Sequence, residues 1–379
     1  MKKIALIGST GSIGKQTLSV VNRHKDKFQI VSLAAGNNVG EFYNQVKEFN
    51  PKVATLSFLP SDLKENLPSD VEFYSGENAF TNAIIDEADV VVVALVGFKG
   101  IIAVLDAIEK GKDVALANKE SLVVGGELVM QKAKEKGVKI MPVDSEHSAV
   151  WQCLNFDFNA PFNKIILTAS GGAFRDFDLT KLKNATAKDA LVHPNWNMGA
   201  KITIDCATLV NKAFEVIEAK WLYNTSFDKI DAIIHRESIV HSMVELADGA
   251  VMAQLGFPSM ELPIQLALTY PERIYSGVKT LDFTAIKNLT FDSIDKERFP
   301  CFDLVLSAAK EGGQYPAVAN GANEQAVKLF LENKIGYFDI YKAIYGALQS
   351  YYGGHHVHFE DLEAADTFAR DYVKALFGV

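Results

Sequence analysis

The chain has few cysteines, no excess of basic charge and no long hydrophobic run. Its three cysteines, Cys153, Cys206 and Cys301, are odd in number and far apart, which excludes a disulfide framework and is typical of reduced thiols. The formal net charge of −9 argues against a nucleic-acid partner, which needs clustered lysine and arginine. The longest apolar run, Val90 to Gly97, is far shorter than the roughly 20 residues of a membrane span. We therefore expect a cytoplasmic protein with no membrane partner.

A chain of 379 residues is too long for one hydrophobic core and predicts two or three domains. The apolar run within Met1–Gly8 is too short for a signal peptide, so we interpret it as the first strand of the fold. Residues 1–143 alternate short apolar runs with segments of helical spacing. This alternation predicts an α/β domain with a Rossmann-like, doubly wound parallel sheet.

The rest of the chain predicts a second and a third structural region. Residues 144–279 mix strand and helix patterns and predict an α+β domain, with one helix over Asp205–Ala219. Within it, residues 173–199 are polar and lack periodicity, which is typical of a functional loop. Residues 280–299 form a linker, and residues 300–379 predict a small helical domain.

Glycines recur at Gly8, Gly11 and Gly14, directly after the first predicted strand. Glycine lets the backbone approach a pyrophosphate closely, and the helix expected to start near Ser12 directs its free N–H groups and positive dipole end at the anion. The spacing is a wide variant of the dinucleotide fingerprint. The alternative is a simple tight turn between strand and helix.

The end of the second predicted strand helps to choose between NAD and NADP. NAD sites place an acidic residue there to bind the ribose hydroxyls, whereas this chain has Gly36-Asn37-Asn38. Because a carboxylate would repel a 2′-phosphate, its absence favours NADP. The alternative is that these three residues only form a turn.

Asp144 and Glu146 follow a predicted strand that ends at Val143. On extended chain, a spacing of two places both carboxylates on one side, at the edge of the sheet where ligands bind. Two adjacent carboxylates repel each other unless a cation lies between them. Taken alone, the pair is better explained by a solvated turn.

The predicted helix over Asp205–Ala219 carries Asn211, Lys212 and Glu215 on one face, at i,i+3 and i,i+4 spacings. With Asp205 as N-cap, this face lies near the positive end of the helix, where a lysine and an amide suit a phosphate. Glu215 then completes a set of three carboxylates, which selects Mg²⁺ or Mn²⁺. The alternative, which the spacing alone favours, is an ordinary amphipathic helix with an internal Lys–Glu pair.

Two loop motifs supply further candidate residues. Ser170-Gly171-Gly172 offers a hydroxyl and backbone amides to an anion, or else is a flexible loop. The segment His193–Gly199 combines a histidine with Trp196 in a polar stretch. As a lid, Trp196 would cover a ligand and exclude water. The alternative is a tryptophan that anchors the loop to the core.

In combination and in order, these motifs resemble those of the 1-deoxy-D-xylulose 5-phosphate reductoisomerase family. The matching strings are Gly8-Ser9-Thr10-Gly11-Ser12-Ile13-Gly14, Ala117-Asn118-Lys119-Glu120-Ser121, Val143-Asp144-Ser145-Glu146-His147, His193–Gly199, Asn211-Lys212 through Glu215, Met260-Glu261-Leu262-Pro263 and Ala319-Asn320-Gly321-Ala322-Asn323-Glu324. The resemblance covers nearly the whole chain. It implies rearrangement and NADPH-dependent reduction of 1-deoxy-D-xylulose 5-phosphate to 2-C-methyl-D-erythritol 4-phosphate in non-mevalonate isoprenoid synthesis, by a homodimer that needs Mg²⁺ or Mn²⁺.

The resemblance also implies roles for single residues. The implied metal ligands are Asp144, Glu146 and Glu215. The implied catalytic residues are Lys119, Glu146, His193 and Trp196. The implied substrate contacts are Lys119, Ser145, Glu146, Ser170, His193, Cys206, Asn211, Lys212 and Glu215. The implied NADPH contacts are Gly8, Thr10, Gly11, Ser12, Ile13, Gly36, Asn37, Asn38, Asn118, Glu120 and Gly199.

Two positions depart from the family pattern. Cys206 stands where members usually have serine, and a thiol is a poorer hydrogen-bond donor to phosphate. Asn37 stands where many members have lysine, which bears on the preference for NADPH.

Two rival functions remain open at this point. Another NADP-linked dehydrogenase, acting on a semialdehyde or on homoserine, would explain the first domain but not the three carboxylates. A non-catalytic nucleotide sensor would explain Cys206 and Asn37 but not the metal ligands. Turnover of a semialdehyde or homoserine without a metal ion would identify the dehydrogenase. Nucleotide binding without turnover of any sugar phosphate would identify the sensor.

Overall fold

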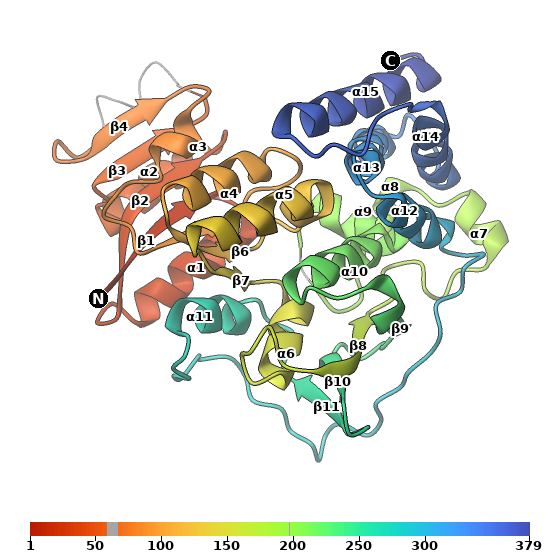
Figure 1. Ribbon diagram of the computed structural model, residues 1–379, viewed down its shortest axis with the longest axis horizontal. Helices are drawn as coiled ribbons and strands as arrows, with labels where there is room; N and C mark the ends of the chain where they lie inside the picture. The colour runs from red at the N-terminus through yellow and green to blue at the C-terminus, as the bar shows by residue number, and fades with distance from the viewer. Residues whose placement is uncertain (59–66, 197) are drawn as a thin grey trace. The chain divides into compact units, whose positions relative to one another are not determined.

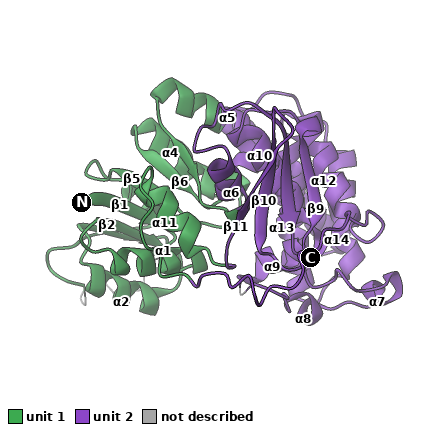
Figure 2. Ribbon diagram, turned by 90° about the horizontal axis from the view of Figure 1, so that it is seen from below, with its two compact units in different colours: residues 1–121, 129–145, 259–278 green, residues 122–128, 146–258, 279–379 purple. Residues whose placement is uncertain are grey.

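The computed structural model describes residues 1–58, 67–196 and 198–379, and these fall into two compact units (Figures 1 and 2). The first unit comprises residues 1–121, 129–145 and 259–278. The second comprises residues 122–128, 146–258 and 279–379. Asn197 of the expected lid lies outside the described residues.

The first unit is built on a seven-stranded, wholly parallel sheet in the order β4-β3-β2-β1-β5-β6-β7. Its strands are β1 (Lys2–Ile7), β2 (Phe28–Ala35), β3 (Val53–Leu56), β4 (Glu72–Ser75), β5 (Val90–Val93), β6 (Asp113–Leu116) and β7 (Ile140–Pro142). The order reverses between β1 and β5, which both carry continuous buried apolar runs. In doubly wound sheets, ligands bind at this reversal, outside the carboxyl ends of the strands.

The helices of this unit follow its strands. They are α1 (Ser12–Arg23), α2 (Val39–Phe49), α3 (Ala79–Asn82), α4 (Gly100–Glu109), α5 (Glu120–Lys136) and α11 (Glu261–Thr269). Helix α11 comes from a later part of the chain and packs against α1, where Arg23 pairs with Glu261 at 2.7 Å. Helix α5 loses helical geometry at Gly125, and residues 122–128 belong to the second unit.

The second unit contains a four-stranded mixed sheet in the order β11-β10-β8-β9. Its strands are β8 (Phe162–Ala169), β9 (Ile230–Ile234), β10 (Val240–Leu246) and β11 (Val251–Leu255). Strand β10 runs antiparallel to β8 and β11, whereas β8 and β9 run parallel. Most of residues 280–299 is irregular, and one bridge joins Asp292 to Ile234.

The helices of the second unit include the helical C-terminal region, drawn in blue in Figure 1. They are α6 (Ser145–Cys153), α7 (Leu179–Lys183), α8 (Ala187–Ala190), α9 (Ala200–Thr208), α10 (Val210–Leu222), the 3₁₀ turn Phe227–Lys229, α12 (Pro300–Glu311), α13 (Tyr315–Leu331), α14 (Tyr337–Ser350) and α15 (Phe359–Phe377). Ser145, the first residue of α6, is counted with the first unit.

The predicted fold class is confirmed, and four local predictions are wrong. Glu146 lies in the first turn of α6, not on extended chain. The helix predicted over Asp205–Ala219 is two helices separated at Leu209, whose φ is 57°. The stretch 173–199 contains the short helices α7 and α8. Strand β4, at the edge of the sheet, was not predicted, because it is largely exposed and lacks an apolar run.

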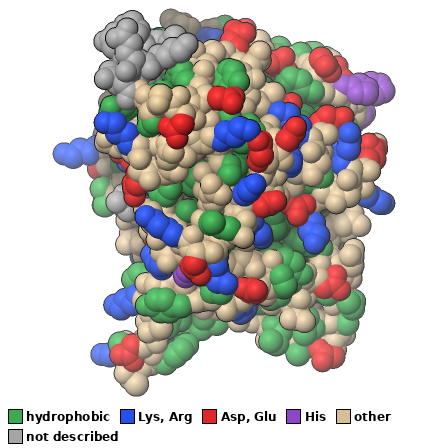
Figure 3. Space-filling model, turned by 90° about the vertical axis from the view of Figure 1, so that its left-hand side faces the viewer, with side chains coloured by type: hydrophobic (Ala, Val, Ile, Leu, Met, Phe, Trp, Pro, Cys, Tyr) green, Lys and Arg blue, Asp and Glu red, His purple; other side chains and the backbone are tan. Residues whose placement is uncertain are grey.

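On the face shown in Figure 3, acidic and basic side chains are interspersed rather than gathered by sign. Among the described residues, none of the helices combines the length and apolar character required to span a bilayer.

Candidate functional site

The segment from Gly8 to Gly14, which comprises the loop after β1 and the start of α1, is closely packed, and we call it the glycine cradle. Gly8 has a φ of 96°, and a Cβ on it would lie 2.5 Å from the carbonyl oxygen of Ala94. A Cβ on Gly14 would lie 2.3 Å from the carbonyl oxygen of Gly8. Gly11 is the extended N-cap of α1 and leaves the first-turn N–H groups without a side-chain cap. The loop therefore presents backbone donors and the positive end of α1, as a pyrophosphate requires.

The remaining residues of this loop and those after β2 lie where the sequence predicts. Thr10 precedes the N-cap, and Ser12 and Ile13 open α1. Gly36 follows β2 directly, Asn37 is exposed, and the side chain of Asn38 caps α2 by accepting from the Glu41 backbone N–H.

Asn118 is fully buried and its amide is used within the protein. Its Nδ2 donates to the carbonyl of Leu95 at 3.2 Å and to that of Gly97 at 3.1 Å, and also to Glu120. Its Oδ1 accepts from Ser121. Asn118 therefore fixes the loop after β5, beside the point where the strand order reverses.

Lys119 and Asp144, which follow β6 and β7, form a buried ion pair. Their strands are neighbours in the sheet, so their carboxyl ends meet at one edge. Asp144 Oδ1 also accepts from the backbone N–H of Ser145, which is buried. The sheet thus brings together the predicted lysine and the first predicted metal ligand.

In the second unit, Lys212 lies between two predicted metal ligands. Its Nζ donates to Glu146 at 2.8 Å and to Glu215, and also to the carbonyl of Thr168. Burial by itself would lower the pKa of Lys212, but the carboxylates of Glu146 and Glu215 outweigh it and raise that pKa above its usual value. Asn211 donates to Glu215, which confirms the predicted shared helix face. The cluster joins one cation to two carboxylates that are 66 and 3 residues away in sequence.

The break at Leu209 places Asn211 and Lys212 in the first turn of α10. The predicted position at the positive end of a helix is therefore right, although the predicted N-cap, Asp205, is wrong. Asp205 lies within α9, where it is buried, pairs with Lys201 at 2.8 Å and accepts from Asn323 at 2.8 Å.

A buried pair that the sequence analysis did not single out holds α6 against α10. His147 is fully buried, its Nε2 lies 2.8 Å from the carbonyl oxygen of Glu215, and its Nδ1 lies 3.2 Å from Glu218. The hydroxyl of Tyr223 donates to the carbonyl of His147. His147 stands beside Glu146 in the sequence, and no helical spacing connects it to Glu218. The pair supports the helices that carry Glu146 and Glu215.

Ser170 and His193 form a hydrogen-bonded pair whose proton positions can be assigned. His193 Nδ1 accepts from the backbone N–H groups of Asn195, at 3.2 Å, and Trp196, at 2.9 Å. The proton of the neutral ring is therefore on Nε2, which donates to Ser170 Oγ at 3.0 Å. Burial, and next the charge of Arg175, lower the pKa of His193 to about 4. His193 is neutral near pH 7 and acts here as a donor.

We expect acid to destabilise the fold through His193 and His241, because burial also lowers the pKa of His241 to about 4. Both rings stay neutral in the folded state, whereas unfolded histidine takes up a proton near pH 6.5. The unfolded state therefore binds more protons between about pH 6.5 and about pH 4. Stability is fully present above this window and falls within it as the pH decreases. Urea unfolding at about pH 7 and about pH 5 measures the loss.

The variant His193→Asn tests this assignment. Its amide oxygen still accepts the two backbone N–H groups, but the side chain cannot titrate, so the loss of stability at low pH should be smaller than in the wild type. The exposed His355, changed to Asn, serves as the control and should leave the loss unchanged. An equal loss in all three proteins would contradict the assignment.

The other predicted residues of the second unit lie along α9 and the segment before it. Gly199 is the extended N-cap of α9, and Cys206 lies half-buried in the last turn. Trp196 is half-buried, with its ring 6.2 Å from that of His241. The predicted residues thus form two sets, one in each unit, and each set contains an ion pair between positions far apart in sequence, Lys119–Asp144 in the first and Glu146–Lys212 in the second.

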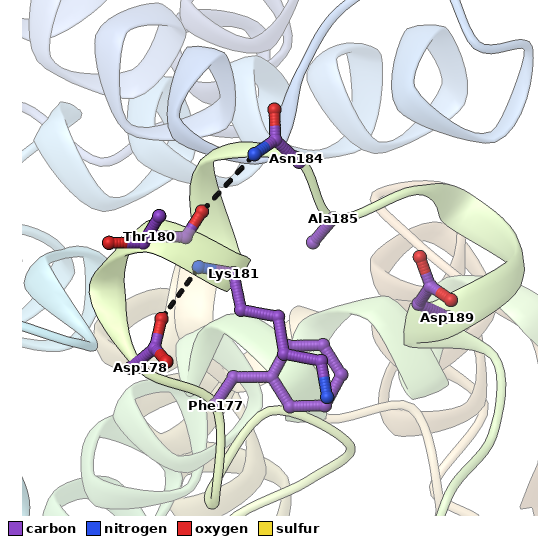
Figure 4. Close-up of a pocket in the computed structure, with 7 residues that line it drawn as sticks. All are labelled: Phe177, Asp178, Thr180, Lys181, Asn184, Ala185 and Asp189. Carbon is purple, nitrogen blue, oxygen red and sulfur yellow. Dashed lines mark hydrogen bonds between the residues drawn. The ribbon is translucent and has the colours of Figure 1, made fainter.

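A surface cavity of about 380 Å³ lies beside α7 and α8 (Figure 4). Its lining residues are Phe177, Asp178, Thr180, Lys181, Asn184, Ala185 and Asp189. The ammonium of Lys181 lies 4.0 Å from the ring centre of Phe177, and Asp178 caps α7 by accepting from the Lys181 backbone N–H at 2.7 Å. These contacts stabilise the short helix, and none of the predicted site residues lines the cavity.

Family models cover most of the chain. Residues 4–126 match 1-deoxy-D-xylulose 5-phosphate reductoisomerase, and residues 140–223 match the C-terminal domain of the same reductoisomerase. Residues 255–372 match a DXP reductoisomerase C-terminal domain.

Individual proteins match over nearly their whole length. The 1-deoxy-D-xylulose 5-phosphate reductoisomerase of Caldanaerobacter subterraneus is 48% identical, over 98% of both chains. That of Chloroherpeton thalassium is 47% identical, over 98% of this chain and 97% of the relative. A crystal structure of DOX-P reductoisomerase with NADPH, fosmidomycin and magnesium superposes with a TM-score of 0.94 at 37% identity, covering 100% of this chain and 98% of the other. The Zymomonas mobilis enzyme with NADPH gives 0.92 at 41% identity, over 99% of both chains.

Proposed function

The chain belongs to the 1-deoxy-D-xylulose 5-phosphate reductoisomerase family, and we propose that it converts 1-deoxy-D-xylulose 5-phosphate to 2-C-methyl-D-erythritol 4-phosphate with NADPH and a divalent metal ion. This reaction belongs to non-mevalonate isoprenoid synthesis. The observation that carries the proposal is the Glu146–Lys212–Glu215 cluster. It joins the carboxylate of Glu146, from α6, to Lys212 and Glu215 on α10, and so supplies carboxylates for a metal ion beside a lysine for a phosphate. Neither a plain dehydrogenase nor a nucleotide sensor needs this arrangement.

The metal site consists of Asp144, Glu146 and Glu215. Glu146 and Glu215 already share one cation, the Lys212 ammonium, and Asp144 comes two residues before Glu146. Oxygen donors alone suit Mg²⁺ or Mn²⁺, so the residues fit the ion. When bound, such an ion supplies Lewis-acid stabilisation of charge on the substrate's oxygens. Lys119 and Ser145 flank Asp144 and contact the substrate's polar groups.

The substrate's phosphate is bound by residues of the second unit. Asn211 and Lys212 act with the positive end of α10, and the Ser170 hydroxyl, supported by His193, acts from the loop after β8. Cys206 contributes a weaker contact from α9. Binding energy from this remote group fixes the reacting carbons in a productive geometry. Trp196 covers the bound substrate and excludes water.

NADPH is bound by the glycine cradle. The backbone packs too closely at Gly8 and Gly14 to admit a Cβ, and the first turn of α1 has no side-chain cap, so the loop can offer free backbone N–H groups to the pyrophosphate. Thr10, Gly11, Ser12 and Ile13 complete the cradle. The other contacts come from Gly36, Asn37, Asn38, Asn118, Glu120 and Gly199. NADPH supplies the hydride, and the protein supplies its orientation.

Further features of the enzyme are part of the proposal. Residues 1–143 bind NADPH, residues 144–279 carry the catalytic groups and the lid, and residues 280–299 connect them to the helical region 300–379. The protein is a cytoplasmic homodimer, and its few, widely separated cysteines suit a reducing compartment. Light scattering of the purified protein tests the oligomeric state.

The proposed activity is tested by mixing purified protein with NADPH, Mg²⁺ and 1-deoxy-D-xylulose 5-phosphate and following nicotinamide absorbance. We expect oxidation of NADPH that depends on both the sugar phosphate and the metal ion, and a chelator should abolish it. The absence of oxidation at high enzyme concentration would defeat the proposal. Turnover without a metal ion would favour another dehydrogenase.

We expect Gly14→Ala to raise the KM for NADPH by about tenfold or more, because its Cβ would collide with the backbone of Gly8 and Ser9 and displace the cradle. The KM for the sugar phosphate should change little. Steady-state kinetics measure both values. Gly40→Ala in α2 is the matched control, because a Cβ there meets nothing within 4 Å. Equal KM values for NADPH in the two variants would contradict the role of the cradle.

A further inference from the structure

The side chain of Arg175 forms hydrogen bonds that hold the loop after β8 in place. Its Nη1 donates to the carbonyl oxygen of Ser170 at 3.0 Å and to that of Arg236 at 3.2 Å. Its own carbonyl accepts from the guanidinium of Arg298. The side chain therefore joins the backbone of Ser170 to the turn between β9 and β10, and the main chain of Arg175 is itself held.

The two glycines after Ser170 make this arrangement possible. Gly171 has a φ of 84°, and a Cβ on it would lie 2.8 Å from the Cβ of Arg175. Gly172 has a φ of 63°, and a Cβ on it would lie 2.4 Å from the carbonyl oxygen of Cys206. One glycine therefore makes room for Arg175 and the other for α9. The loop is closely packed on both sides.

The consequence concerns the Ser170 hydroxyl. Its oxygen accepts from His193 Nε2 at 3.0 Å and from the backbone N–H of Gly172 at 3.2 Å. A hydroxyl oxygen accepts at most two hydrogen bonds, so these donors use both lone pairs. The remaining hydroxyl proton is directed away from them and suits an anionic oxygen.

The charge of Arg175 acts on the same group of residues. Burial is the larger cause of the low pKa of His193, and the charge of Arg175 lowers it further, so the field of Arg175 reaches the imidazole. A cation there keeps His193 as a neutral donor to Ser170 and also attracts an anion bound beside the hydroxyl.

We propose that Arg175 is a positioning residue for the substrate's phosphate: it holds the Ser170 carbonyl in place so that the hydroxyl proton, set by His193 and Gly172, points at the phosphate. This inference rests on the proposed function. Arg175 acts through Ser170 and through its charge. It therefore affects recognition of the phosphate rather than the redox step.

The experiment compares Arg175→Gln, Arg175→Lys and the control Arg236→Gln. The guanidinium of Arg236 is exposed and pairs with Asp176 at 2.6 Å and Asp292 at 3.5 Å. For Arg175→Gln we expect the KM for 1-deoxy-D-xylulose 5-phosphate to rise about tenfold, with smaller changes in kcat and in the KM for NADPH. Competitive inhibition by inorganic phosphate should weaken by a similar factor. Arg175→Lys keeps the charge but not the two-carbonyl bridge and should fall between the wild type and Arg175→Gln.

The inference is overturned if Arg175→Gln and Arg236→Gln have the same KM for the sugar phosphate and the same inhibition by phosphate. It is also overturned if the KM values for NADPH and for the sugar phosphate rise together, because that pattern indicates a structural role only. Thermal melting of each variant identifies a folding defect. If Arg175→Gln has such a defect, the KM of Arg175→Lys for the sugar phosphate tests the inference instead. A wild-type protein that does not oxidise NADPH would instead defeat the proposed function.

Discussion

Glu215→Gln is expected to lower kcat by about 10²–10³-fold and to weaken Mn²⁺ binding, while NADPH binding survives. The amide keeps the size of the side chain and its acceptor for Lys212, but it removes one of the negative charges that a divalent ion needs. The cofactor cradle belongs to the other unit and should be unaffected. Steady-state kinetics, Mn²⁺ titration followed by electron paramagnetic resonance, and NADPH fluorescence measure the three quantities.

Glu218→Gln is the matched control for this change. Glu218 lies on the same helix, is equally buried, and pairs with His147 instead of Lys212. We expect Glu218→Gln to affect Mn²⁺ affinity less, because Glu218 supports the helices without being a proposed ligand. If Glu218→Gln loses the metal ion and Glu215→Gln retains it, the assignment of the ligands is wrong.

The fold of the first unit could be predicted because its buried strands are continuous apolar runs. The second predicted strand ends before Gly36, as β2 (Phe28–Ala35) does in the structure, since Gly36 and the two asparagines after it separate it sharply from α2 (Val39–Phe49). Strand β4 escaped prediction because its pairing partner, β3, is separated from it in sequence and its side chains are largely exposed. An exposed edge strand carries little hydrophobic signal.

The break between α9 and α10 could not be predicted from local sequence. It occurs at Leu209, a residue that seldom takes positive φ, with no glycine or proline to mark it. Leu209 is buried, so packing within the unit imposes the conformation. The start of α6 is a similar case. Asp144 and Glu146 follow a strand that ends at Pro142, and no glycine or proline stands between that residue and the first turn of the helix to mark the change.

Within the site, helical spacing predicted which residues of one helix lie together, whereas contacts between distant parts of the chain could not be predicted. The i,i+3 and i,i+4 spacings correctly predicted that Asn211, Lys212 and Glu215 share a face. No pattern connects Glu146 to Lys212, because they are 66 residues apart and only the fold brings them together. Arg175 was not predicted either, since the contacts of its Nη1 are with distant backbone carbonyls, which the sequence does not display.

Lys212→Met is expected to lower the free energy of unfolding by about 3–5 kcal/mol in the absence of a divalent ion. The change removes the ammonium that neutralises Glu146 and Glu215, and it leaves two carboxylates close together with little contact to water. A divalent ion bound by the same carboxylates replaces that charge. Added Mg²⁺ should therefore raise the melting temperature more in Lys212→Met than in the wild type. Urea unfolding and thermal melting, each with and without Mg²⁺, measure these effects.

Lys220→Met on the same helix is the control, because the Lys220 ammonium lies 3.3 Å from the ring centre of Trp221 and is not part of the carboxylate cluster. It should cost about 1 kcal/mol or less and show the wild-type response to Mg²⁺. Lys212→Met should also raise the KM for the sugar phosphate, since the lysine is a proposed phosphate contact. A variant that loses turnover yet keeps wild-type stability, with no added response to Mg²⁺, would show that Lys212 does not neutralise the two carboxylates. The charge balance proposed for the metal site would then be wrong, whatever the effect on catalysis.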